Sequence, residues 1–304
     1  MKPLAVVSLA LTFVVVVVGA YVRLSDAGLG CPDWPLCYGR AIPDATEDAR
    51  AWKEMGHRYL AGTLGIVLFV LALAAWRTRQ SPWLATAIAA LVVFQATLGK
   101  WTVTMLLKPA IVVAHLAGGM ALLALLTWFL LGRFVHLTAP DARTLRVPAF
   151  VALLVLSMQI LLGGWVSANY AGLACPDLPL CLGQALPLMD FANAFHVLRE
   201  LGRTDAGELL PQAALTAIHW SHRMFALIVL ATIGWVALRA IRIVPGIAMA
   251  IAFLLILQFA LGVANVAFSL PLALAAAHNA GAAALLVALV VLNFFAFRGL
   301  RPSR

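Results

Sequence analysis

The chain has 304 residues, of which 64% are hydrophobic and only 11% are charged, and its formal net charge is +9. A soluble domain usually carries about 25% charged residues, so this composition excludes an ordinary soluble globular protein. No stretch combines basic and aromatic residues as a nucleic-acid surface would, so nucleic acid is excluded as a partner. We therefore expect an integral membrane protein surrounded by membrane lipid.

Eight hydrophobic runs are long enough to cross a bilayer, which takes about 20 residues of helix. The first run continues into GAYVRLSDAG without a clear small-residue cleavage site, so we interpret it as a span and not as a signal peptide. The sequence predicts an all-α integral membrane protein with eight transmembrane helices. These spans cover residues 4–22, 57–76, 83–100, 110–131, 148–167, 213–237, 246–266 and 272–297.

Basic residues gather at one end of these spans. With an even number of spans both termini lie on one side, and the short connections there, 77–82 and 239–245, contain arginine and no acidic residue. Short loops rich in lysine and arginine stay in the cytoplasm. We therefore expect a multi-pass protein of the cell (plasma) membrane with both termini in the cytoplasm, and the positive net charge is a signal of orientation.

A short cysteine motif occurs twice in the predicted outer loops. GLGCPDWPLCYG follows the first span, and GLACPDLPLCLG follows the fifth. Outside the cytoplasm the environment is oxidising, so we expect the local disulfides Cys31–Cys37 and Cys175–Cys181. Bridges that join Cys31 to Cys175 and Cys37 to Cys181 remain open. Zinc fits less well, because five intervening residues are not the usual ligand spacing.

The cysteine motif belongs to a longer internal repeat. GAYVRLSDAGLGC matches GGWVSANYAGLAC, QATLG matches QFALG, and AHLAGGMALL matches AHNAGAAALL. The offset between matching segments grows along the chain because the loop at 188–212 is longer than its counterpart. We expect two tandem, pseudo-symmetric four-helix bundles in the same orientation, over residues 1–140 and 141–304.

Four histidines lie at matching positions on the even-numbered spans: His57, His115, His222 and His278. Each half thus offers two histidines at a similar depth on two helices, which is the ligand set of a six-coordinate heme iron. A lone histidine in a membrane helix usually bonds to a neighbouring helix and binds nothing. Copper or zinc is another alternative, although the apolar spans hold few carboxylates to complete a metal shell. The repetition favours heme ligation.

Other polar residues near these histidines have weaker assignments. Arg58 and Arg223 each follow a histidine at an outer helix end, and we expect them to pair with heme propionates through bidentate bonds. Snorkelling of the two arginines to the membrane interface is the alternative. His136 and His196 lie in loops without a matching partner, and we interpret both as solvated.

The two halves differ three residues before the outer histidine. Glu54 in the first half corresponds to His219 in the second. This position lies on the same helix face as the histidine, one turn outward. A carboxylate near a heme edge can accept a proton or stabilise a developing cation, so we expect Glu54 to be catalytic. The alternative is that Glu54 complements the positive end of its helix.

These motifs together resemble the heme A synthase family over nearly the whole chain. The resemblance lies in GLGCPDWPLC, in E-x-x-H-R at 54–58, in HR at 222–223, and in the histidines of the fourth and eighth spans. It implies oxidation of a methyl group of heme O to a formyl group through a hydroxymethyl intermediate, giving heme A for terminal oxidases. It also implies heme O synthase and an electron acceptor as partners. Whether the protein assembles as a homo-oligomer is left open by the sequence.

The resemblance also implies roles for single residues. Glu54 is then the catalytic carboxylate, and His57 and His115 flank the substrate heme O in the N-terminal bundle. His222 and His278 then ligate a resident heme b cofactor in the C-terminal bundle.

Two other functions remain open at this point. One is a diheme b-type membrane electron carrier or quinol oxidoreductase, in which both hemes are permanent. The other is a heme-handling transporter or assembly protein without redox chemistry.

Overall fold

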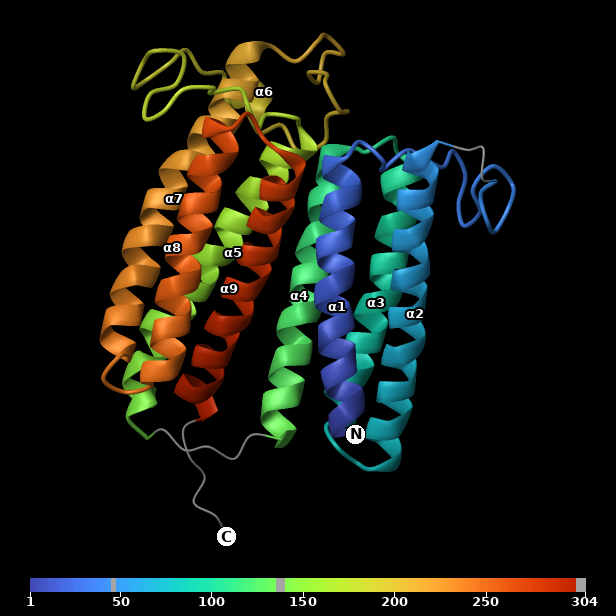
Figure 1. Ribbon diagram of the computed structural model, residues 1–304, viewed down its shortest axis with the longest axis vertical. Coiled ribbons are helices and arrows are strands. Elements are labelled where there is room, and N and C mark those ends of the chain that lie inside the picture. The colour runs from blue at the N-terminus through green and yellow to red at the C-terminus, as the bar shows by residue number, and fades with distance from the viewer. Residues whose placement is uncertain (45–47, 135–139, 299–304) are drawn as a thin grey trace.

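Eight long helices form the body of the protein in a computed structural model that describes residues 1–44, 48–134 and 140–298 (Figure 1). All eight are long and apolar enough to cross a membrane, and each predicted span lies inside one of them, so the prediction of eight spans is confirmed. The long helices are α1 (Lys2–Leu24), α2 (Ala49–Arg77), α3 (Pro82–Thr104), α4 (Pro109–Phe134), α5 (Arg146–Ala168), α7 (Gln212–Ala240), α8 (Pro245–Ala267) and α9 (Leu272–Arg298). Two short helices, η1 (Pro140–Leu145) and α6 (Phe191–Ala194), lie between them.

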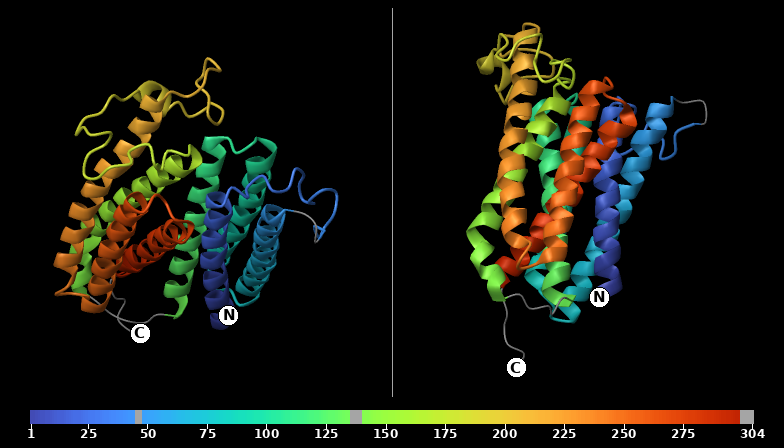
Figure 2. Two further views of the ribbon diagram at one scale, coloured as in Figure 1. Left: turned by 45° about the horizontal axis from the view of Figure 1, so that its top comes forward. Right: turned by 60° about the vertical axis from the view of Figure 1, so that its left-hand side comes forward.

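The long helices form two groups of four that lie side by side (Figures 1 and 2). In the first group α1 packs against α2 and α4, and α3 packs against the same two helices. In the second group α5 packs against α7 and α9, and α8 packs against the same two helices. This packing is compatible with tandem pseudo-symmetry, which stays a prediction, as does the domain boundary at residues 140 and 141.

Helix α9 lies at the centre of the molecule. It contacts α5 and α8 in its own group and α1 and α4 in the other. In the most apolar 18-residue stretch of α9, 61% is buried inside the protein, against 17% in the corresponding stretch of α8. Asn293 near its end donates a side-chain hydrogen bond to the backbone oxygen of Ala149 on α5 at 2.9 Å. The contacts of α9 with α1 and α4, which belong to one apolar cluster, join the two groups. The start of α1 and the end of α9 lie at the same end of the molecule (Figure 1).

Helix α2 begins well before the hydrophobic run that predicted it. Its first two turns, ARAWKEM, hold three charged residues among seven, and the side chain of Asp48 caps them by accepting a hydrogen bond from the backbone N–H of Arg50 at 2.9 Å. This extension carries Glu54 into the helix, one turn from His57, and sets both residues against the first cysteine loop.

Candidate functional site

Each cysteine loop is closed by its own disulfide bond. The structure joins Cys31 to Cys37 and Cys175 to Cys181, with Cα atoms 4.8 and 4.6 Å apart. The sequence alone had left bridges between the two loops open. A bridge within each loop closes a compact loop at the end of its helix group that lies opposite the chain's N-terminus (Figure 1).

An aspartate shapes each loop from inside. Asp33 accepts hydrogen bonds from the backbone N–H groups of Tyr38 and Gly39 at 2.7 and 2.8 Å. Asp177 accepts the two corresponding bonds at 2.6 and 2.8 Å. The backbone N–H of Gly183, above all, lowers the pKa of the Asp177 carboxyl, because it stabilises the ionised form.

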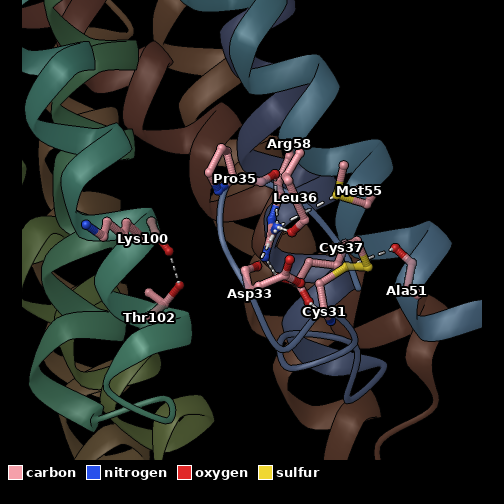
Figure 3. A network of polar contacts seen from close by, with 12 residues as sticks. Cys31, Asp33, Pro35, Leu36, Cys37, Ala51, Met55, Arg58, Lys100 and Thr102 are labelled. Carbon is pink, nitrogen blue, oxygen red and sulfur yellow. Dashed lines mark hydrogen bonds and ion pairs between the residues drawn. A yellow bond between two sulfur atoms is a disulfide. The ribbon is translucent and has the colours of Figure 1, made fainter. Parts of the chain in front are cut away.

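Arg58 and Arg223 tie these loops to their helices. Figure 3 shows Arg58 reaching from α2 into the first loop, where its Nη1 donates to the backbone oxygens of Asp33 and Leu36 at 3.0 and 2.7 Å. Arg223 on α7 donates in the same way to the backbone oxygen of Asp177 at 2.9 Å. The loop carbonyl groups therefore engage donors of both arginines, and the pairing of these arginines with propionates stays a prediction.

Glu54 and His219 occupy equivalent places beneath the two loops. Oε2 of Glu54 accepts the backbone N–H of Cys31 at 2.8 Å, while Oε1 forms an ion pair with Arg58. Nδ1 of His219 accepts the backbone N–H of Cys175 at 3.2 Å. Both side chains are buried, at 5% and 4% exposure. The two halves therefore differ in the group that accepts the equivalent loop N–H. It is a carboxylate in the first half and an imidazole in the second.

The two histidines of the first half each pack against a glycine on a neighbouring helix. A Cβ atom on Gly19 of α1 would lie 2.9 Å from Cε1 of His57, which is closer than real Cβ contacts come. A Cβ on Gly99 of α3 would lie 3.4 Å from Cε1 of His115. Glycine at these two positions lets each ring lie directly against the neighbouring backbone, which fixes the level of the ring in the bundle.

The second half repeats this arrangement. A Cβ on Gly163 of α5 would lie 3.1 Å from Cε1 of His222, and one on Gly262 of α8 would lie 3.2 Å from Cε1 of His278. In addition, each Nε2 lies near a glutamine amide nitrogen, at 3.5 Å from Gln159 for His222 and at 3.3 Å from the α8 glutamine for His278. The two glutamines lie next to the proposed ligands, and the sequence alone gives them no role.

The histidine rings also carry unsatisfied polar atoms. Among the described residues, Nδ1 of each of the four rings is buried and has no hydrogen-bond partner. Buried polar atoms without a partner are uncommon, and they often mark a functional site. No three His, Cys, Asp or Glu side chains cluster as a metal-ion site in the described part of the chain. Paired histidines on apolar walls fit a heme, whose iron needs two protein ligands, better than a copper or zinc ion.

A cavity of about 590 Å³ joins the predicted residues of the first half. Glu54, His57, Arg58 and His115 all line it, together with many apolar side chains. A pocket for a cofactor-sized ligand typically has about 300–1,000 Å³, mostly apolar walls and a few polar groups. The cavity therefore brings together the carboxylate and both histidines that the sequence assigns to the N-terminal site.

The cavity also reaches the lipid-facing surface of the first helix group. Tyr59 and Phe69 on α2 and Val93 on α3 line it, and these side chains are 45%, 50% and 52% exposed. An apolar molecule dissolved in the membrane can therefore meet the cavity between α2 and α3.

Several polar residues in the cavity wall have no assignment from the sequence, and three of them are Arg23, Ser167 and Asn279. Arg23 lies near the end of α1, and Ser167 and Asn279 come from the second helix group. The repeat carries a signal for one of them, because Arg23 stands where GGWVS has Ser167. Of the two loop histidines, His196 lies 3.7 Å from Asp205 and does not line the cavity, and His136 lies outside the described residues.

Comparisons with known proteins agree over both halves of the chain. The model of the COX15-CtaA family, cytochrome oxidase assembly protein, matches residues 2–290. The heme A synthase of Shewanella oneidensis is 40% identical, over 95% of this chain and 94% of its own length. Heme A synthases of Caulobacter sp. and Caulobacter vibrioides are 33% and 30% identical, each over 96% of this chain and 94% of the relative.

Proposed function

Because the chain belongs to the COX15-CtaA family, and within it to the heme A synthases, we propose that it converts heme O to heme A. The reaction oxidises one methyl group of the porphyrin to a formyl group through a hydroxymethyl intermediate, and its product serves terminal oxidases. The observation that carries this proposal is the apolar cavity whose wall holds Glu54, His57 and His115 together.

The N-terminal bundle, residues 1–140, is the proposed substrate site. The paired histidines His57 and His115 supply two imidazoles for the iron of heme O, and the glycines behind them hold the rings at a fixed level. The opening between α2 and α3 supports entry of the apolar substrate from the lipid. Heme O synthase is the proposed supplier of that substrate.

Glu54 is the proposed proton acceptor. Conversion of a methyl group and one water molecule to a formyl group removes four electrons and four protons in two steps, and a positioned base can take up these protons. The carboxylate is held between the Cys31 N–H and the Arg58 guanidinium, so its place relative to the cavity is fixed. The electrons pass to an acceptor that we propose as a further partner.

The C-terminal bundle, residues 141–304, is the proposed site of a resident heme b. His222 and His278 would hold its iron, a proposal supported by their glycine contacts and their unpartnered Nδ1 atoms. Heme b, when bound there, supplies one-electron redox chemistry between the reacting site and the acceptor. The chain fixes the position and the tautomer of the two imidazoles, and Gln159 and Gln258 contribute to this through their contacts with the ring nitrogens.

The proposed topology follows from charge and fold. The disulfide loops lie on the extracytoplasmic side and both termini in the cytoplasm, because the short connections between α2 and α3 and between α7 and α8 are basic. The proposed assembly state is a homo-oligomer.

A diheme b-type electron carrier is the second candidate, favoured by the presence of a histidine pair in each half. Extraction of the bound pigment and its mass analysis separate the two functions. We expect formyl or hydroxymethyl heme from cells that make heme O. Two unmodified hemes b per chain contradict the synthase and support the carrier.

A further inference from the structure

Arg23 is a cation in the cavity wall to which none of the proposed functional motifs assigns a role. It lies on the last turn of α1, lines the cavity, and has a side chain that is only 12% exposed. The repeat places Ser167 at the corresponding position of the second helix group, so this charge belongs to the proposed reacting half alone. A buried cation is costly unless anions or hydrogen-bond acceptors surround it.

The contacts of Arg23 leave part of its guanidinium without a partner. Nη2 donates to the backbone oxygen of Ser167 at 2.8 Å, and the guanidinium lies 4.0 Å from the ring centre of Tyr170. Its ion-pair partner among the described residues is Asp26, at 3.8 Å and with a side chain that is 66% exposed. Nε is buried and has no partner in the described part of the chain. Nη2 therefore holds the side chain in place, while Nη1, which lies 3.8 Å from the exposed Asp26, is the nitrogen that can donate to a ligand.

The place of Arg23 relative to the histidines is set by α1. Gly19, against which the ring of His57 packs, lies four residues earlier on the same helix face. At 1.5 Å of rise per residue, Arg23 lies roughly 6 Å further toward the outer end than Gly19. A porphyrin held between His57 and His115 can therefore direct one of its edges to Arg23.

We infer that Arg23 binds a propionate carboxylate of the substrate heme and so fixes the rotation of the porphyrin in the cavity. The inference rests on the proposed function, because it takes the ligand of this cavity to be a heme. Arginine is suited to this task, since its planar fork matches a carboxylate in a bidentate pair. Arg58, the other arginine in the wall, already donates to the first cysteine loop and pairs with Glu54.

This role explains why the charge is confined to one half. Rotation of the porphyrin decides which methyl group comes nearest to Glu54, and only a reacting heme requires that choice. Arg23 is therefore a positioning residue: it binds a part of the substrate that does not react and thereby selects the methyl group that does.

The test is a heme titration of the purified full-length protein in detergent, followed by difference absorbance. The two probes are hemin and hemin dimethyl ester, whose propionates are neutral. Loss of a hydrogen bond to a charged group weakens binding by about 10- to 100-fold. We expect wild type to bind hemin more tightly than the ester by such a factor, and Arg23→Gln to bind both probes as weakly as wild type binds the ester.

Two control variants keep the result specific. Lys53→Gln removes a positive charge outside the cavity lining, where the lysine lies 5.4 Å from the Tyr21 ring, and it should keep the preference for hemin. Arg23→Lys keeps the charge but lacks the fork, so it should lose several-fold in hemin affinity and none in ester affinity. Because it retains the cation, it also serves if Arg23→Gln is not recovered folded.

Two results overturn the inference in different ways. If an Arg23 variant weakens the binding of hemin and of the ester equally, or weakens neither, Arg23 only links α1 to the end of α5 through its hydrogen bond to Ser167. If His57→Ala leaves the titrated binding unchanged, the proposed heme site is itself wrong, and the inference falls with it.

Discussion

The carboxylate of Glu54 accepts a hydrogen bond from the backbone N–H of Cys31 at 2.8 Å. The proposed catalytic group is therefore attached directly to the first residue of a disulfide-closed loop. Arg58 reinforces the link, because it pairs with Glu54 and donates to the loop carbonyl groups at the same time. A disturbance of the loop thus changes the position of the carboxylate.

The first prediction concerns the disulfides. Peptide mapping of the unreduced protein should recover Cys31 with Cys37 and Cys175 with Cys181, and removal of either bridge should cost about 2–3 kcal/mol of stability. Replacing both cysteines of the first pair by serine should also lower heme A formation more than the same change in the second pair, since only the first loop holds Glu54. A peptide that links Cys31 to Cys175 would contradict the local clips.

The second prediction concerns the resident heme. His222→Ala or His278→Ala should remove one axial ligand, so the purified variant should lose its tightly bound b-type heme. The visible spectrum measures this directly. His196→Ala, in the loop between α6 and α7, is the matched control and should keep the spectrum. An intact six-coordinate heme in either proposed ligand variant would show that the ligands are assigned wrongly.

The third prediction uses the glycines beneath the histidines. Gly19→Ala should displace the ring of His57, because the new Cβ would lie 2.9 Å from Cε1 in the present structure. Substrate heme binding should weaken by at least about tenfold, as expected when a ligand geometry is lost. Gly56→Ala on α2 is the control, since a Cβ there meets nothing within 4 Å. Equal heme titrations for the two variants would refute the role of Gly19.

The spans could be predicted from the sequence because the run length and composition of a membrane helix are local properties. The sequence predicts the start of this span eight residues late, at 57 instead of Ala49, since the first turns of α2 hold three charged residues and depend on the Asp48 cap. The histidines and Glu54 can be singled out from the sequence because the chain repeats and because Glu54 and His219 are among the positions where the two copies differ.

Other parts of the site depend on which helices lie opposite each other. The spacing of the four cysteines does not decide how they pair, because bridges within each loop and bridges between the loops both use all four. Gln159 stands in a long apolar helix, and its contact with His222 exists only once α5 packs against α7. Arg23 differs visibly from Ser167 in the repeat, but its place in a cavity wall became evident only in the structure.

The last prediction concerns Glu54 itself. Glu54→Gln keeps the size of the side chain and its acceptor for the Cys31 N–H, but it removes the charge and the ability to take up a proton. The variant should fold, retain the heme of the C-terminal half and bind heme O. Its rate of heme A formation should fall by about 10²–10⁴-fold, the usual contribution of a general acid–base group, with some hydroxymethyl intermediate accumulating.

The matched change His219→Gln in the other half provides the control. His219 accepts the equivalent N–H, from Cys175 at 3.2 Å, and glutamine can replace that acceptor. This variant should therefore lose much less activity, because its half is the proposed site of the resident heme and not of the reacting one. Both variants are expressed together with heme O synthase, and hemes O and A and the alcohol are quantified by chromatography. Near-normal heme A from Glu54→Gln would reduce the carboxylate to an anchor for the loop, and a larger loss from His219→Gln would place the reaction in the C-terminal half.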